Sequence, residues 1–176
     1  FCSPEGAFVG VRHSLFRLTP TEADAVREEI DSQVAAAISA GIQPSHLDSH
    51  HHIHTEWAVA VIAIEVARRR EVPAIRLSRN CGPGISLLKR VYKRALNTRL
   101  CLAGLAKTRW FGSVDDVRPI LGHVDGPVEV MVHPRLDDAG HVVDTRQGLL
   151  ADLVAKLPLR QPAVSYTALA LLGPRH

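Results

Sequence analysis

Apolar residues recur at helical spacing over several stretches of this chain. In the first stretch they are Ala25, Ile30, Val34 and Ile38, which fall close to one face of a helix with 3.6 residues per turn. Threonine hydroxyls ahead of the acids of the first turn suit a helix start, and Gly41 suits its end. The pattern predicts a helix over residues 20–40, and similar patterns predict helices over 55–70, 85–105 (one long or two short), 114–122 and 145–157.

Short apolar runs bounded by turn residues lie between these predicted helices. They predict strands at residues 46–54, 72–77, 110–113, 128–134 and 163–166. Alternation of helix and strand is typical of a parallel sheet or barrel, so we expect one α/β domain over residues 1–176. Functional side chains gather at the carboxyl ends of strands in such folds. Residues 50–54, Arg76 and His133 lie late in their strands and should converge on one face.

The densest concentration of chemically active side chains is in residues 46–54. Five of the ten histidines lie there. An extended backbone would place His46, Asp48, His50, His52 and His54 on one face. Neutral imidazole and carboxylate are common ligands of a catalytic divalent ion, of which one or two would bind while the others orient the site or face substrate. The alternative is a metal-free polar cleft; an expression tag is disfavoured because the stretch is internal and interrupted.

Composition limits the class of protein. A chain of 176 residues with 46% apolar residues is enough for one core, and the longest apolar run, residues 57–64, is too short to span a bilayer. The sequence does not begin with Met, and its first residues lack the pattern of a signal peptide, so we expect a fragment or a processed form. Cys2, Cys81 and Cys101 lack CxxC spacing and are predicted to be reduced thiols of a cytoplasmic protein.

The charge pattern has two interpretations. The net charge is +3, and basic residues concentrate between positions 68 and 109. A nucleic-acid interface would use such a cluster, but aromatic residues make up only 5% of the chain and no recognition motif is present. We therefore favour a solvated helical face and expect no nucleic-acid partner.

The histidine stretch carries a resemblance to a known family. Residues 46–54, His-Leu-Asp-Ser-His-His-His-Ile-His, resemble the HxDxHxHxH signature of the YdjC-like family, the ChbG/HpnK-type carbohydrate deacetylases. Residues 130–134 resemble that family's strand ending in His-Pro, and Gly41 and Pro44 fit the layout before the motif. Arg76, residues 111–112 and residues 162–166 also fit. The similarity extends over nearly the whole chain.

The resemblance implies a distorted, parallel β/α barrel-like fold. It also implies an enzyme that removes acetyl groups from N-acetylated sugars with a divalent metal, Mg²⁺ or Zn²⁺. The substrate would be a mono- or oligosaccharide or a glycolipid. It implies that His50 is a metal ligand and that His133 is a catalytic acid or base. Arg76 would contact substrate or a carboxylate. Without the family resemblance, a catalytic role for His133 and a structural role at the end of its strand are equally plausible.

The other residues of the motif acquire roles by the same resemblance. Asp48 and His46 would support the ligands, whereas His52 and His54 would line the cleft and contact substrate. The family pattern also has an Asp-Asp pair at the end of its first strand and a second metal-binding His, and neither has a match here. We therefore expect an N-terminally truncated domain whose open sheet edge favours a homo-oligomer. The alternative is a non-catalytic sugar- or metal-binding relative that has lost these ligands.

Overall fold

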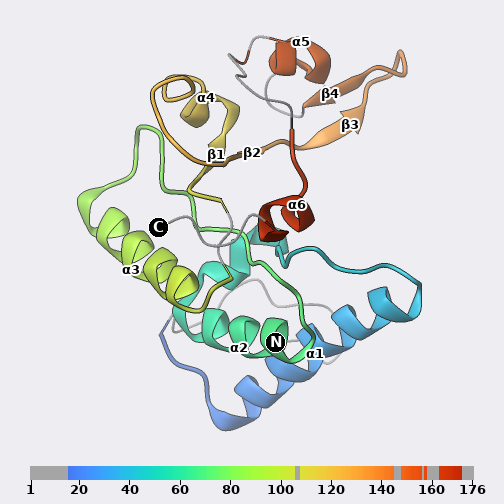
Figure 1. The fold of residues 1–176 in the computed structure, drawn as a ribbon, viewed down its shortest axis with the longest axis vertical. Helices are drawn as coiled ribbons and strands as arrows, with labels where there is room; N and C mark the ends of the chain where they lie inside the picture. Colours follow the sequence, from blue (N-terminus) through green and yellow to red (C-terminus); the bar gives the residue numbers. More distant parts are fainter. Residues whose placement is uncertain (1–15, 106–107, 145–147, 156, 158–162, 172–176) are drawn as a thin grey trace.

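A computed structural model describes residues 16–105, 108–144, 148–155, 157 and 163–171. Figure 1 shows helices and parallel strands in one chain, which confirms the α/β class. The elements in chain order are α1 (Pro20–Ser39), a 3-10 helix η1 (His50–Thr55), α2 (Trp57–Arg69), α3 (Leu87–Leu102), β1 (Trp110–Ser113), α4 (Val114–Val117), β2 (Val128–Met131), β3 (Pro134–Leu136), β4 (Val142–Asp144), β5 (Gly148–Leu149), α5 (Leu150–Ala155) and α6 (Tyr166–Leu171).

The first helix forms where the sequence predicts it. The Thr19 hydroxyl accepts the Glu22 backbone N–H at 3.3 Å, and the Glu22 carboxylate accepts the Thr19 N–H at 2.7 Å, which is a capping box. Gly41 follows the helix with a φ of 80°, a conformation that costs glycine little. Val34 of α1 is buried against the apolar face of α2, so these two helices form one side of the core.

The extended segment before η1 pairs with the segment after α2. The Leu47 N–H donates to Ala74 O at 2.9 Å, and the Arg76 N–H donates to Leu47 O at 3.0 Å. Leu47 and Ile75 thus form a parallel bridge. Residues 72–77 make this bridge without becoming a regular strand, because Pro73 has no backbone N–H to donate.

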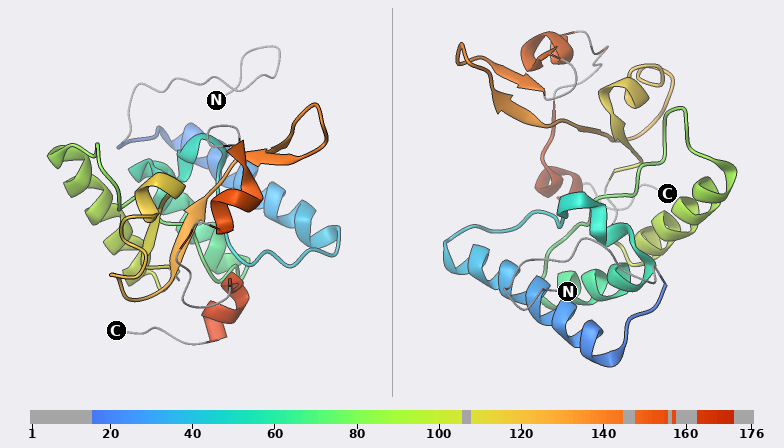
Figure 2. Two further views of the ribbon diagram at one scale, coloured as in Figure 1. Left: turned by 90° about the horizontal axis from the view of Figure 1, so that it is seen from above. Right: turned by 180° about the vertical axis from the view of Figure 1, so that it is seen from behind.

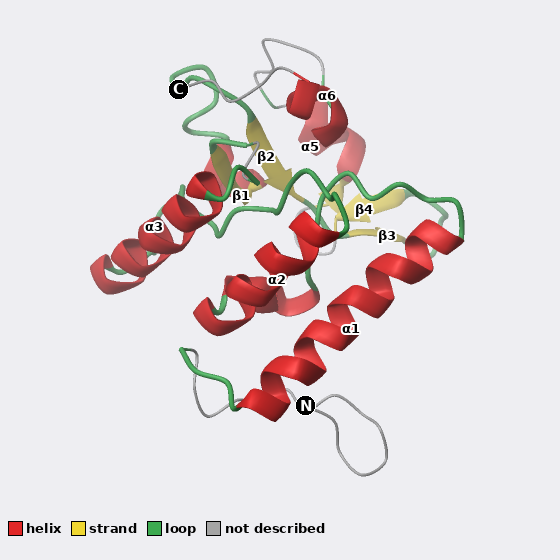
Figure 3. Ribbon diagram, turned by 60° about the horizontal axis from the view of Figure 1, so that its bottom comes forward, coloured by secondary structure: helices red, strands yellow, loops and turns green. Residues whose placement is uncertain are grey.

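The same layer continues through two more segments. The Ile75 N–H donates to Leu105 O at 2.8 Å, and the Asn80 N–H donates to Phe111 O at 3.1 Å. β1 then pairs in parallel with β2. Four segments therefore lie side by side in chain order, with α2, α3 and α4 in the connections between them. In Figure 3, α1, α2 and α3 stand in front of the strands.

The chain after β2 departs from the predicted pattern. Residues 128–134 were expected to be one strand, but β2 ends at Met131 and Pro134 opens β3. β3, β4 and β5 form an antiparallel sheet, and Gly140 in the β3–β4 turn has a φ of 81°. Proline is tolerated at the start of an edge strand, which explains why Pro134 begins a new strand here. Figure 2 shows this hairpin projecting from the helices.

Three other predicted elements were wrong in extent or type. The helix expected over 114–122 ends at Val117, two residues before Pro119. The helix expected over 145–157 starts at Leu150, because residues 148–149 pair with β4; residues 145–147 and 156 lie outside the described part. The strand expected over 163–166 is absent: Tyr166 begins α6, and the Ser165 hydroxyl accepts the Ala168 N–H at 3.1 Å.

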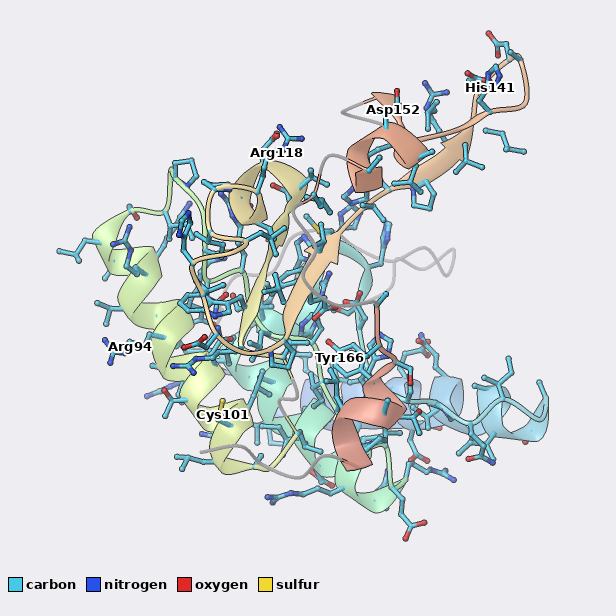
Figure 4. All side chains as sticks on the ribbon, turned by 45° about the horizontal axis from the view of Figure 1, so that its top comes forward. Arg94, Cys101, Arg118, His141, Asp152 and Tyr166 are labelled. Carbon is cyan, nitrogen blue, oxygen red and sulfur yellow. The ribbon has the colours of Figure 1, made fainter. Side chains whose placement is uncertain are left out.

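Three basic residues of α3 face solvent. Lys89, Arg90 and Arg94 are exposed, and Figure 4 shows Arg94 on the outer side of the helix. This agrees with a solvated helical face. Across the described residues, no helix combines the length and apolar character that crossing a membrane would require.

Candidate active site

The histidine stretch turns where an extended strand was predicted. It is extended through Leu47 and then coils into η1, in which His51 and His52 have φ values of 53° and 59°. Ser49 closes the turn, because its hydroxyl accepts the His54 N–H at 3.0 Å. The expected alternation of five side chains on one face is therefore wrong beyond Asp48. The turn instead directs successive imidazoles into different surroundings.

His54 is the buried histidine of the motif, with 4% of its surface exposed. Its Nε2 lies 3.1 Å from the Arg76 carbonyl oxygen, which only accepts, so Nε2 carries the proton. Nδ1 then accepts the Ser49 hydroxyl at 2.6 Å. Burial, followed by the Arg76 charge, lowers the pKa of His54 to about 4. His54 is therefore neutral and binds the backbone of Arg76, while its predicted contact with substrate stays a prediction.

Acid should destabilise the protein through His54. Its folded-state pKa of about 4 lies below the ordinary 6.5, so between these values the unfolded chain binds the proton and the folded chain does not. The contribution is complete above about pH 6.5 and falls by on the order of 2–3 kcal/mol as pH drops to 4. Urea unfolding at pH 7.5 and 4.5 measures it. The loss should shrink in His54→Gln and persist in the exposed-site control His123→Gln; an equal loss in both variants would contradict this assignment.

Arg76 is the centre of the cluster. Its side chain is 5% exposed, and its Nη2 lies 2.7 Å from Asp48 Oδ1 and 2.6 Å from His52 Nδ1. The guanidinium also lies over the Phe111 ring, 4.5 Å from the centroid. Because arginine only donates, His52 Nδ1 must accept and Nε2 must carry the proton. Burial and the Arg76 charge lower the pKa of His52, which agrees with this neutral tautomer.

One donor of Arg76 is left over. Its Nε is buried and has no hydrogen-bond partner among the described residues. A buried unpaired donor costs about 1–3 kcal/mol, and such costs are concentrated at functional sites. Arg76 thus contacts both Asp48 and His52, which were predicted to belong to the same site. Their roles toward substrate stay predictions.

Two residues of this region were not assigned a role from the sequence. Glu129 of β2 accepts the Tyr166 hydroxyl at 2.5 Å, and the Tyr166 ring stacks on His46 with 4.2 Å between centroids. Burial raises the pKa of the Glu129 carboxyl, while Tyr166 and Arg76 act in the opposite direction. A charged residue inside the apolar run 128–132 was the signal that could have identified Glu129.

His133 follows the end of β2 and has an exposed side chain. Its backbone N–H donates to the buried Asp144 carboxylate at 2.7 Å, so β4 holds this point of the chain in place. His133 contributes to the lowered pKa of His52, which places the two imidazoles within electrostatic range. The convergence of the His133 side chain with the Arg76 cluster stays a prediction.

His50, the predicted metal ligand, is exposed at the start of η1. Its ring packs edge-to-face on His51 with 4.1 Å between centroids. Within the described part of the chain, no three or more His, Cys, Asp and Glu side chains are grouped to share one ion. Asp48 Oδ1 is already bound by Arg76 and by the Ser49 N–H. The described residues therefore offer His50 as a candidate ligand without completing a metal site.

The site thus belongs to an α/β protein whose polar cluster lies where parallel segments end. A family model described as YdjC-like protein matches residues 1–160. The chain belongs to the YdjC-like family, as its histidine motif indicated.

Curated relatives agree with this assignment. A carbohydrate deacetylase of Halalkalibacterium halodurans is 25% identical over 137 residues, which cover 77% of this chain and 54% of that protein. Carbohydrate deacetylases of Brevibacillus brevis and Vibrio cholerae are 32% identical over 69 residues (39% of this chain, 27% of that protein) and 44% identical over 50 residues (28% and 20%). The longest of these matches spans about half of the relative's length. No solved structure matches the chain.

Proposed function

We propose that this chain forms part of a metal-dependent hydrolase that removes acetyl groups from N-acetylated sugars. The substrate class is a mono- or oligosaccharide or a glycolipid. The observation that carries the proposal is the contact of Arg76 with Asp48 and His52 in a member of the YdjC-like family. The name shared by the relatives, carbohydrate deacetylase, supports the reaction type.

The arrangement assigns each group a task. Hydrolysis of an acetamide needs a proton for the departing amine, and an exposed imidazole such as His133 is suited to donate it. His52 presents a protonated Nε2 because Arg76 occupies Nδ1, so it can donate to a substrate oxygen. Arg76 holds His52 and Asp48 in fixed positions through its Nη2, and the proposal keeps the predicted contact of Arg76 with substrate or a carboxylate.

The proposal includes a divalent ion, Mg²⁺ or Zn²⁺, with His50 as one ligand. Such an ion, when bound, polarises the acetyl carbonyl and lowers the pKa of a water molecule. Imidazole favours zinc, whereas carboxylate and water ligands would suit magnesium. Further ligands would come from outside the described residues.

Three wider features belong to the same proposal. The four parallel segments and their intervening helices are consistent with part of a β/α barrel. Cys81 and Cys101 are free thiols, which suits a reducing cytoplasmic location, while Cys2 lies outside the described part. Pairing of two copies through an open sheet edge stays a prediction.

The metal part of the proposal is tested on protein expressed from its complete gene. Removing metal with a chelator should abolish acetate release, and adding back Zn²⁺ or Mg²⁺ should restore it. His50→Ala should lower metal content in elemental analysis and reduce release by about 10- to 100-fold. His51→Ala, which alters the neighbouring ring of the same turn, should retain metal. Full metal content and activity in His50→Ala would remove His50 from the ligand set.

A further inference from the structure

The Glu129–Tyr166 contact joins parts of the chain that are distant in sequence. Glu129 lies on β2, Tyr166 begins α6, and His46 precedes the bridge at Leu47. We propose that Glu129 and Tyr166 are a positioning pair that fixes the His46 imidazole so that its Nε2 hydrogen-bonds a hydroxyl of the bound sugar. This inference rests on the proposed function for its ligand and gives His46 a substrate-binding role.

The stacking geometry holds the imidazole plane. The rings of His46 and Tyr166 are 15° from parallel with centroids 4.2 Å apart, which leaves the imidazole little freedom to rotate. On the ring edge, Nδ1 lies 3.1 Å from the Ser45 hydroxyl. The other nitrogen, Nε2, has no hydrogen-bond partner within the described part of the chain. One nitrogen is thus engaged locally and the other is available to a ligand.

The carboxylate of Glu129 holds the tyrosine in turn. Its Oε2 accepts the Tyr166 hydroxyl at 2.5 Å and also lies 3.4 Å from the Thr108 hydroxyl. Burial and the Glu129 hydrogen bond raise the pKa of the Tyr166 phenol, which therefore stays a donor. Placing a carboxylate in a half-buried strand is costly unless it is hydrogen-bonded, so loss of the phenol would affect both residues.

The pair also connects His46 to the Arg76 cluster. His46 directly precedes Leu47, whose carbonyl oxygen accepts the Arg76 N–H at 3.0 Å. A sugar bound beside Arg76 would therefore have the His46 ring nearby. Orienting a sugar hydroxyl requires a polar group that is held in a fixed position, and stacked and hydrogen-bonded side chains provide this.

NMR of the His46 ring tests the positioning without relying on activity. A ring stacked on tyrosine has its carbon-bound protons shifted upfield. The shift should be lost in Tyr166→Leu and reduced in Tyr166→Phe and Glu129→Leu, which break the hydrogen bond. Glu129→Gln keeps an acceptor and should retain it. Tyr92→Phe is the matched control, because the Tyr92 hydroxyl donates to Thr55 O and does not contact His46. An unchanged His46 spectrum in Tyr166→Phe and Glu129→Leu would overturn the pair.

Kinetics on an N-acetylated sugar tests the substrate contact. Loss of one hydrogen bond predicts a KM raised about threefold to tenfold in Tyr166→Phe and His46→Phe, with kcat unchanged. Glu129→Leu should raise the KM as well, and Glu129→Gln should bring it back toward the wild-type value. An unchanged KM in His46→Phe, or a fall in kcat alone, would refute the sugar contact. If wild type lacks activity, the proposed function fails, whereas the spectra still decide whether Glu129 and Tyr166 position His46.

Discussion

Replacing Arg76 with methionine should reduce acetate release by about 100-fold or more, because misplacement of catalytic groups by roughly 1 Å is enough for such a loss. The substitution keeps much of the side-chain length but removes the donor shared by Asp48 and His52. It should also cost about 2–3 kcal/mol of stability, less than a fully buried pair, because the Asp48 side chain is 43% exposed. Arg76→Lys should recover only part of the activity, because a lysine ammonium cannot reproduce the planar set of N–H donors of a guanidinium.

The control for Arg76 is a second ion pair elsewhere in the fold. Arg70 donates from Nε and Nη2 to the two oxygens of Asp31, and this pair joins α1 to the end of α2. Arg70→Met should lower stability while keeping kcat. Steady-state kinetics and urea unfolding on both variants separate the two effects. If Arg76→Met loses stability but retains full turnover, Arg76 is structural and our account of the cluster is wrong.

His133→Ala should lower kcat by about 100- to 10,000-fold, the range expected when a general acid or base is removed. Stability should change by less than about 0.5 kcal/mol, because the side chain is exposed. The structural contact of this residue is its backbone N–H to Asp144, which alanine retains. Single-turnover kinetics would show whether the loss lies in the chemical step.

His141→Ala provides the matched control for His133. His141 is also exposed and also close to a carboxylate, with Nδ1 lying 3.3 Å from Asp137 Oδ2. Figure 4 shows it at the tip of the hairpin, far from Tyr166. Activity should be unchanged in this variant. Equal and small effects of the two substitutions would leave His133 as a strand-end residue without a catalytic role.

The sequence predicted the α/β class and much of the element order because these depend on local patterns. Helical spacing and threonines ahead of acidic residues located α1, and the apolar run before His133 located β2. The histidine motif also identified the family correctly. These signals are local, so they do not depend on which segments later become neighbours.

Contacts between distant segments could not be predicted in this way. The turn at residues 50–55 depends on Ser49 binding His54 across five positions, which a period-two pattern does not reveal. Tyr166 was expected in a strand, and its contact with Glu129 joins residues 37 positions apart. Likewise, Pro134 was expected to end strand structure, whereas the chain forms a hairpin that holds His133. In each case tertiary contacts outweighed local preference.

The central claim is tested most directly by measuring acetate and free amine together. Protein expressed from its complete gene would be incubated with N-acetylglucosamine oligomers and a divalent metal. Our account predicts equal molar amounts of acetate and amine, and loss of both in His133→Ala. Binding of acetylated sugars by folded, metal-loaded protein without release of either product, across mono- and oligosaccharides and glycolipids, would contradict it and favour a non-catalytic binding protein.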